Sequence, residues 1–188
     1  IIALVGYVIC RWVPPAPPEG HETEIQWNPY SASKSLVTFA MKHLELRYAI
    51  LAISVFWTIA AVLSVQFIPL AKNVLLADKQ VAAVMLVAFS GGIAIGSVSI
   101  NALLKGVISA RYSAVSVLAL AVLLIIFYLL CRGWSLEPAG ELFTVPEFLA
   151  QPMALVLLAN LLAIAIAGGM FVVPLYAFLT TKVPKSQA

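Results

Sequence analysis

Four long stretches of the chain are apolar around the whole circumference of a helix, and polar residues gather between them. These stretches cover residues 48–69, 81–104, 112–131 and 152–179. Each can cross a hydrocarbon core about 30 Å thick, which takes a helix of roughly 20 residues. None shows the strict alternation over about ten residues that is typical of membrane β-barrel strands. The pattern predicts an all-α, polytopic transmembrane protein.

The composition supports a membrane protein and excludes a water-soluble monomer. The chain of 188 residues is 63% hydrophobic and 10% charged, with a mean hydropathy of +1.04. Soluble domains, in contrast, are roughly 45–50% apolar and about 25% charged.

The basic residues are distributed unevenly over the two sides that alternating spans create. Eight of the 11 basic residues fall on one side, which the positive-inside rule assigns to the cytoplasm. They are Arg11, Lys34, Lys42, Arg47, Lys105, Arg111, Lys182 and Lys185, and the other side carries Lys72, Lys79 and Arg132. Because topology accounts for the net charge of +3, we expect no nucleic-acid partner.

The segments outside the four spans have characters of their own. We expect residues 1–13 to be the end of a truncated transmembrane helix and residues 182–188 to be a cytoplasmic end. The chain is therefore expected to be an internal piece of a longer protein. Residues 14–47 predict a cytoplasmic linker that opens with prolines, which exclude a helix. Later in the linker, Ser31 or Ser33 is the expected cap of a surface helix in the headgroup plane. The apolar stripe of this helix consists of Leu36, Phe39, Ala40 and Leu44.

Several segments, taken in order, resemble major facilitator superfamily transporters. The run Gly92-Ile93-Ala94-Ile95-Gly96-Ser97, followed by Leu104-Lys105-Gly106-Val107-Ile108-Ser109, resembles the eighth helix and the short cytoplasmic loop after it. More narrowly, the chain resembles bacterial lysophospholipid transporters, including versions fused to an acyltransferase and an acyl-carrier-protein ligase. This narrower resemblance rests on four segments, in the family's order: Val13-Pro14-Pro15-Ala16, Trp27-Asn28-Pro29-Tyr30, Ser54-Val55-Phe56-Trp57 and Gly168-Gly169-Met170-Phe171-Val172-Val173-Pro174-Leu175-Tyr176-Ala177.

The resemblance implies a partial major facilitator fold, from the end of helix six to helix ten, in which residues 48–181 belong to the carboxy-terminal transporter half. The partners that the resemblance implies for this chain are membrane lipid, the lysophospholipid substrate, the missing amino-terminal half with helices eleven and twelve, and a fused or associated acyltransferase. The implied function is to move lysophospholipid, lyso-phosphatidylethanolamine in particular, across the bacterial inner membrane for re-acylation. Two alternatives stay open: an exporter of amphiphilic drugs, and a non-transporting membrane anchor for fused acyltransferase domains.

Small residues mark candidate points of helix contact and movement. Gly92 and Gly96 have the GxxxG spacing, with Ser97 and Asn101 on the same face, which predicts either a static helix contact or a surface that slides during alternating access. Lys105 and Arg111 flank a short loop and act either as a topology signal or as the charged latch that the resemblance implies. Gly168, Gly169 and Pro174 predict a kink or a hinge.

Candidates for the substrate path are the aromatic and uncharged polar residues inside the spans. Phe56 and Trp57 either pack against lipid and neighbouring helices or line an apolar cavity for an acyl chain. Gln66, Ser90 and Asn160 either join helices by hydrogen bonds or face a path. Since no acidic or basic residue lies at the centre of a full span, we expect any carboxylate proton relay in the missing half.

Neither a metal, a cofactor nor an enzyme site is predicted for this segment. His21 and His43 both lie in the linker, and Cys10 and Cys131 lie in or at the end of apolar runs without CxxC spacing. The glycines around Gly91 do not follow a strand, as phosphate-binding loops do. We expect no covalent chemistry here, although the full-length protein can carry fused acyltransferase and ligase domains.

Overall fold

The computed structural model describes residues 6, 11, 29–104, 111–138 and 141–182. Every regular element in this part of the chain is a helix, which confirms the all-α class. The helices are α2 (Pro29–Lys42), α3 (Leu44–Asn73), α4 (Lys79–Leu104), α5 (Arg111–Arg132), α6 (Val145–Leu149) and α7 (Pro152–Lys182). The predicted stub and the proline segment lie outside the described residues, apart from Gly6 and Arg11.

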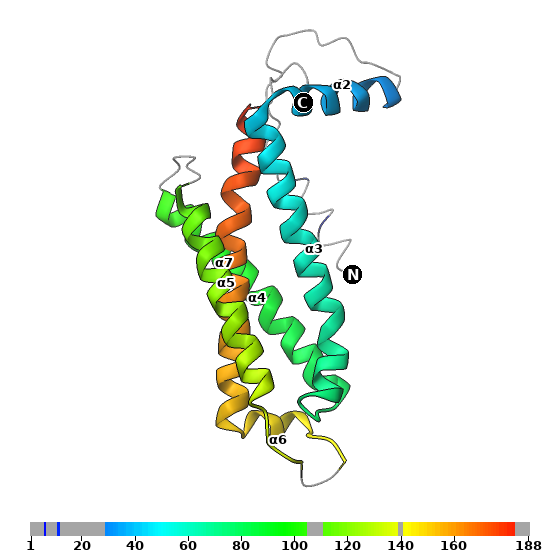
Figure 1. Ribbon diagram of the computed structural model, residues 1–188, viewed down its shortest axis with the longest axis vertical. Coiled ribbons are helices and arrows are strands. Elements are labelled where there is room, and N and C mark those ends of the chain that lie inside the picture. The colour runs from blue at the N-terminus through cyan, green and yellow to red at the C-terminus, as the bar shows by residue number, and fades with distance from the viewer. Residues whose placement is uncertain (1–5, 7–10, 12–28, 105–110, 139–140, 183–188) are drawn as a thin grey trace.

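Four of the helices, α3, α4, α5 and α7, are long and apolar enough to cross a membrane. They alternate in direction, so that α2, the end of α4, the start of α5 and the end of α7 share one end of the bundle (Figure 1). The turn between α3 and α4, together with α6, lies at the other end. Among the described residues of the helices, this alternation groups the basic residues as the sequence predicts. Those at the end with α2 are Lys34, Lys42, Arg47, Arg111 and Lys182, and those at the other end are Lys72, Lys79 and Arg132.

The spanning helices extend beyond the predicted apolar stretches. Helix α3 runs for 30 residues and passes Pro69, where the sequence pattern predicts an end. Proline removes one backbone donor, but the next turn still closes because Val74 N–H donates to the Leu70 carbonyl at 3.1 Å. At about 45 Å, α3 is longer than a hydrocarbon core about 30 Å thick, so it can cross one with residues to spare.

The start of α2 corrects the predicted cap. The helix begins at Pro29, so Ser31 and Ser33 lie inside it rather than before it. Proline suits the first helical position because its fixed φ matches the helix and its missing N–H would have no partner there. A single residue, His43, separates α2 from α3.

Helix α7 is the central element, since it packs against α4, α5 and α3. Its middle is built from small residues, among them Ala163, Ala165, Ala167, Gly168 and Gly169. Small side chains let several helices approach one axis closely. The interface between α4 and α7 is the most extensive, and those of α3 are smaller. Helix α3 is therefore the spanning helix that the described residues hold least firmly to α7 and α4.

The end of the bundle near α6 is closed by an outer cap, formed by residues 74–78, 134 and 143–149. Phe143 N–H donates to the Leu76 carbonyl at 2.7 Å, and Asp78 N–H donates to the Phe143 carbonyl at 3.0 Å. Trp134 stacks on Phe148 with ring centroids 5.6 Å apart. These bonds tie the α3–α4 turn to the α5–α7 connection, and the hydrophobicity pattern did not predict them.

Candidate functional site

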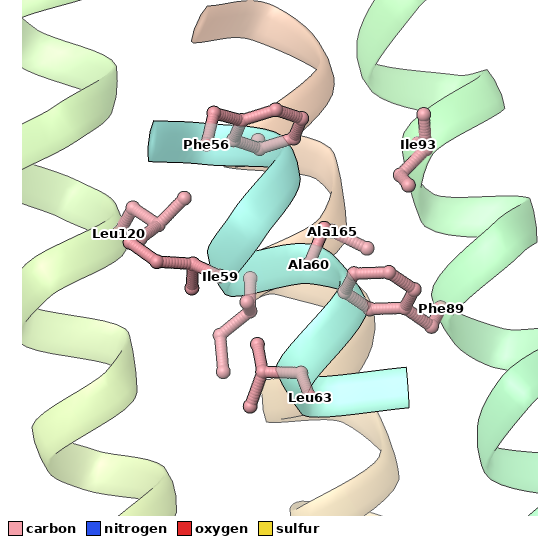
Figure 2. Close-up of a pocket in the computed structure, with 10 residues that line it drawn as sticks. Phe56, Ile59, Ala60, Leu63, Phe89, Ile93, Leu120 and Ala165 are labelled. Atoms are coloured by element: carbon pink, nitrogen blue, oxygen red, sulfur yellow. The ribbon is translucent and has the colours of Figure 1, made fainter. Parts of the chain in front are cut away.

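A small apolar groove lies where the four spanning helices meet. Figure 2 shows side chains from α3, α4, α5 and α7 pointing into it. Its lining, all apolar, is Phe56, Ile59, Ala60, Leu63, Phe89, Ile93, Leu120, Ile164, Ala165 and Gly168. We call it the four-helix groove. Its volume is about 30 Å³, and a single water molecule needs about 10–15 Å³ of such space, so a long acyl chain fits only after helices separate.

Phe56 closes the groove from α3. Its side chain is 7% exposed, and a Cβ atom on Gly168 would lie 2.8 Å from the Phe56 ring. Because Gly168 of α7 has no side chain, the Phe56 ring of α3 can pack directly against the α7 backbone. Phe171 lies next to it, with ring centroids 5.9 Å apart. Thus the structure brings two predicted candidates, Phe56 and Gly168, together at one contact.

Trp57, the neighbouring candidate, does not line the groove. It is 46% exposed, and its indole Nε1–H donates to the Tyr176 hydroxyl on α7 at 2.8 Å. Its ring meets Phe56 edge-on, with centroids 5.5 Å apart. Polar groups within a membrane span require partners, and the Tyr176 hydroxyl provides one for the Trp57 indole N–H. This bond joins residues 119 positions apart, and sequence reasoning missed it because no local pattern marks the pair.

The small-residue face of α4 lies directly against α7. A Cβ atom on Gly96 would overlap the Ile166 carbonyl, and one on Gly92 would lie 2.7 Å from the Leu162 carbonyl. In the other direction, a Cβ atom on Gly169 would lie 2.6 Å from the Ile93 carbonyl. The two backbones are therefore in contact over about one and a half helical turns.

The sequence pattern predicts Ser97 and Asn101 on the same helix face as Gly92 and Gly96, but neither side chain forms a hydrogen bond to α7 in the described structure. The Ser97 hydroxyl donates to the Ile93 carbonyl of its own helix at 2.7 Å. Asn101 is exposed near the end of α4. The contact between α4 and α7 therefore rests on backbone approach rather than on interhelical hydrogen bonds from these two residues.

The three uncharged polar candidates occupy different surroundings. Ser90 is exposed on α4, and Gln66 borders a second groove, of about 390 Å³, between α3 and Phe127 of α5. Asn160 is buried in α7, and its Oδ1 atom accepts no hydrogen bond within the described structure. An unsatisfied buried acceptor costs about 1–3 kcal/mol. None of the three lines the four-helix groove.

The remaining candidates concern the loop after α4 and the proline of α7. Lys105 lies outside the described residues, and Arg111 is the first residue of α5. Pro174 is buried inside α7, which continues to Lys182. Proline leaves the carbonyl four residues earlier without its usual helical donor. The latch and the hinge stay predictions.

In the described residues, no group of three or more His, Cys, Asp or Glu side chains is placed to hold a metal ion. Comparisons of the chain with protein-family models, with curated proteins and with solved structures found no match.

Three structural features are available to support a functional proposal. They are the four-helix groove, the α4–α7 backbone contact and the Trp57–Tyr176 bond.

Proposed function

We propose that the chain is part of a major facilitator transporter that moves lysophospholipid, lyso-phosphatidylethanolamine in particular, across the bacterial inner membrane for re-acylation. The observation that carries the proposal is the four-helix groove, whose lining is entirely apolar. A lysophospholipid has one acyl chain, and a single apolar groove between helices matches it without burying a charge. The ordered segments that resemble bacterial lysophospholipid transporters support the same substrate class.

In the proposed mechanism, α3 moves away from α7 and opens the groove. Helix α3 shares smaller interfaces with its neighbours than α4 shares with α7. Opening lifts the Phe56 ring away from Gly168 and breaks the Trp57–Tyr176 bond. Interhelical hydrogen bonds in membranes are worth about 0.6 kcal/mol on average. A bond of this strength can break and form again during a transport cycle.

The backbone contact between α4 and α7 has the complementary role in this mechanism. Its glycines leave no side chains between the helices, so the two helices move as one unit or slide along a smooth surface. Gly92 and Gly96 provide this surface on α4, and Gly169 provides it on α7. The missing transporter half and helices eleven and twelve complete the path, and a fused or associated acyltransferase consumes the lipid.

Filling the groove tests the proposal. Ile59 borders the groove on α3 and is partly exposed, so Ile59→Trp narrows the groove without replacing a buried core residue. Val62 is exposed on the same helix and does not line the groove, which makes Val62→Trp the matched control. In the full-length protein we expect Ile59→Trp to lower uptake of labelled lyso-phosphatidylethanolamine per folded protein, and Val62→Trp to leave it unchanged.

The same assay separates the alternatives. An exporter of amphiphilic drugs would move a fluorescent amphiphilic dye out of cells, show no uptake of lysophospholipid, and lose dye export in Ile59→Trp. A membrane anchor for acyltransferase domains would show neither activity. Equal uptake by the Ile59→Trp and Val62→Trp variants would remove the groove from the path.

A further inference from the structure

Helix α2 lies across the end of the spanning bundle, where it meets α3 (Figure 1). Its level in the membrane follows from the charges on α3. Arg47 and Lys72 lie about 38 Å apart along the helix axis, so a hydrocarbon core about 30 Å thick fits between them. Because α2 ends just before Arg47, it lies at the level of the lipid headgroups.

One face of α2 presents uncovered apolar side chains. Val37 is 62% and Met41 57% exposed, and Tyr30, one heptad before Val37, is exposed as well. Positions spaced by four and seven residues lie on the same face of a helix. Phe39 and Ala40, part of the stripe that the sequence predicts, are half-buried instead. The helix therefore has a second apolar face, which the described residues leave exposed.

Two cationic side chains belong to this helix. Lys34 lies on the apolar face itself, four residues after Tyr30 and three before Val37, and Lys42 lies to one side of it, next to Met41 in the chain. Lys34 and Lys42 are exposed on α2, and the helix itself carries no acidic residue. Just beyond it, the Arg47 guanidinium carbon lies 5.8 Å from the centre of the Tyr48 ring, which is exposed. Exposed apolar residues with lysines on or beside them and a nearby tyrosine are typical of helices that lie in a membrane interface, because a lysine keeps its charged end among the headgroups.

We propose that α2 docks on the anionic phospholipids of the leaflet that surrounds it. Val37 and Met41 enter the boundary between headgroups and acyl chains, and Lys34 and Lys42 pair with lipid phosphates. Charge complementarity selects this occupant, because a purely apolar face would insert equally into neutral lipid, whereas lysines gain from a negatively charged surface. The inference concerns lipid composition around α2 and does not depend on which substrate is transported.

A nitroxide label on Val37→Cys tests this docking in the full-length protein, with Cys10 and Cys131 replaced by serine. The protein is placed in nanodiscs of phosphatidylcholine alone or with phosphatidylglycerol, and collision of the label with oxygen and with a water-soluble nickel chelate is measured. We expect high oxygen and low nickel accessibility only with phosphatidylglycerol. In Lys34→Gln/Lys42→Gln, the ratio of inserted to uninserted label should fall roughly 30-fold, as two lost surface cations imply.

The double variant Lys72→Gln/Lys79→Gln is the matched control, since it removes two cations at the opposite end of the bundle and should leave the label inserted. Insertion that is equal in both lipid mixtures would overturn the role of anionic lipid. A label that neither oxygen nor the nickel chelate reaches would show that protein covers this face, and would overturn the docking itself.

Discussion

At Gly96 the Ile166 carbonyl of α7 occupies the space into which a Cβ atom would project, whereas nothing lies within 4 Å of the corresponding position at Gly91. Both glycines lie in α4, so alanine at each site has the same effect on helix propensity. We predict that Gly96→Ala destabilises the protein by about 1–3 kcal/mol through overpacking. Gly91→Ala should be neutral or stabilising by up to about 1 kcal/mol. Unfolding in detergent measures both, and equal effects would contradict the backbone contact.

The Trp57–Tyr176 bond calls for a double-mutant cycle. Trp57→Phe and Tyr176→Phe each remove one partner and keep an aromatic ring, so each should lower the free energy of unfolding by about 0.5–1.5 kcal/mol. The double variant should lose little more than either single variant. Additive losses in the same unfolding assay would show that the two groups do not interact.

Some of these residues could be predicted from the sequence, and others could not. The spacing of Gly92 and Gly96 marked a close contact, because only small side chains allow it. The sequence did not separate Phe56 from Trp57, since both are aromatic and adjacent. Their burial differs because their side chains point in different directions around α3, one toward Gly168 and the other toward Tyr176.

Among the elements, α6 depends on a titratable cap. The Glu147 carboxylate accepts hydrogen bonds at 2.9 Å from the Thr144 N–H and from the Thr144 hydroxyl, and these bonds hold the pKa of Glu147 below its ordinary value. A lowered folded pKa means that the carboxylate stabilises α6 above the ordinary glutamate pKa of about 4.3, and that this stabilisation is lost as the pH falls through the lowered value.

We therefore predict that amide protection in α6, corrected for intrinsic exchange, falls on acidification below about pH 4. Glu147→Gln should lower the protection near neutral pH and remove most of this pH dependence. Glu141→Gln, a change of the same kind at an exposed position in the same connection, should keep it. The same pH dependence in Glu147→Gln and in the unmodified protein would exclude Glu147 as the titrating group.

The four spanning helices could be predicted because a long apolar run has one stable arrangement in a bilayer, where every backbone group must bond within its own helix. Helix α6 and the outer cap could not. Their bonds join Phe143 to Leu76 and Asp78 across distant loops, and the strongest local signal, Thr144 followed by Glu147, covers only one turn.

For the molecule as a whole, the positions of the basic residues predict that the end carrying α2 faces the cytoplasm. Cysteine probes at Ser33 on α2 and at Glu141 near α6 mark the two ends. A membrane-impermeant maleimide added to intact cells should modify the probe at Glu141 and spare the one at Ser33. The reverse labelling pattern would invert the orientation.

Movement of α3 away from α7 during lysophospholipid transport is the central claim, and a reversible link between these helices tests it. Cysteines at Trp57 and Tyr176, with Cys10 and Cys131 replaced, are joined in the full-length protein by a reducible bifunctional thiol reagent. Uptake of labelled lyso-phosphatidylethanolamine into spheroplasts is measured before linking, after linking and after reduction.

The account predicts uptake by the unlinked protein, its loss when α3 is held on α7, and its return on reduction. A variant with only one of the two cysteines, treated in the same way, should keep its uptake throughout. Unchanged uptake in the linked protein would contradict the movement of α3, and no uptake by the unmodified protein would contradict the substrate itself.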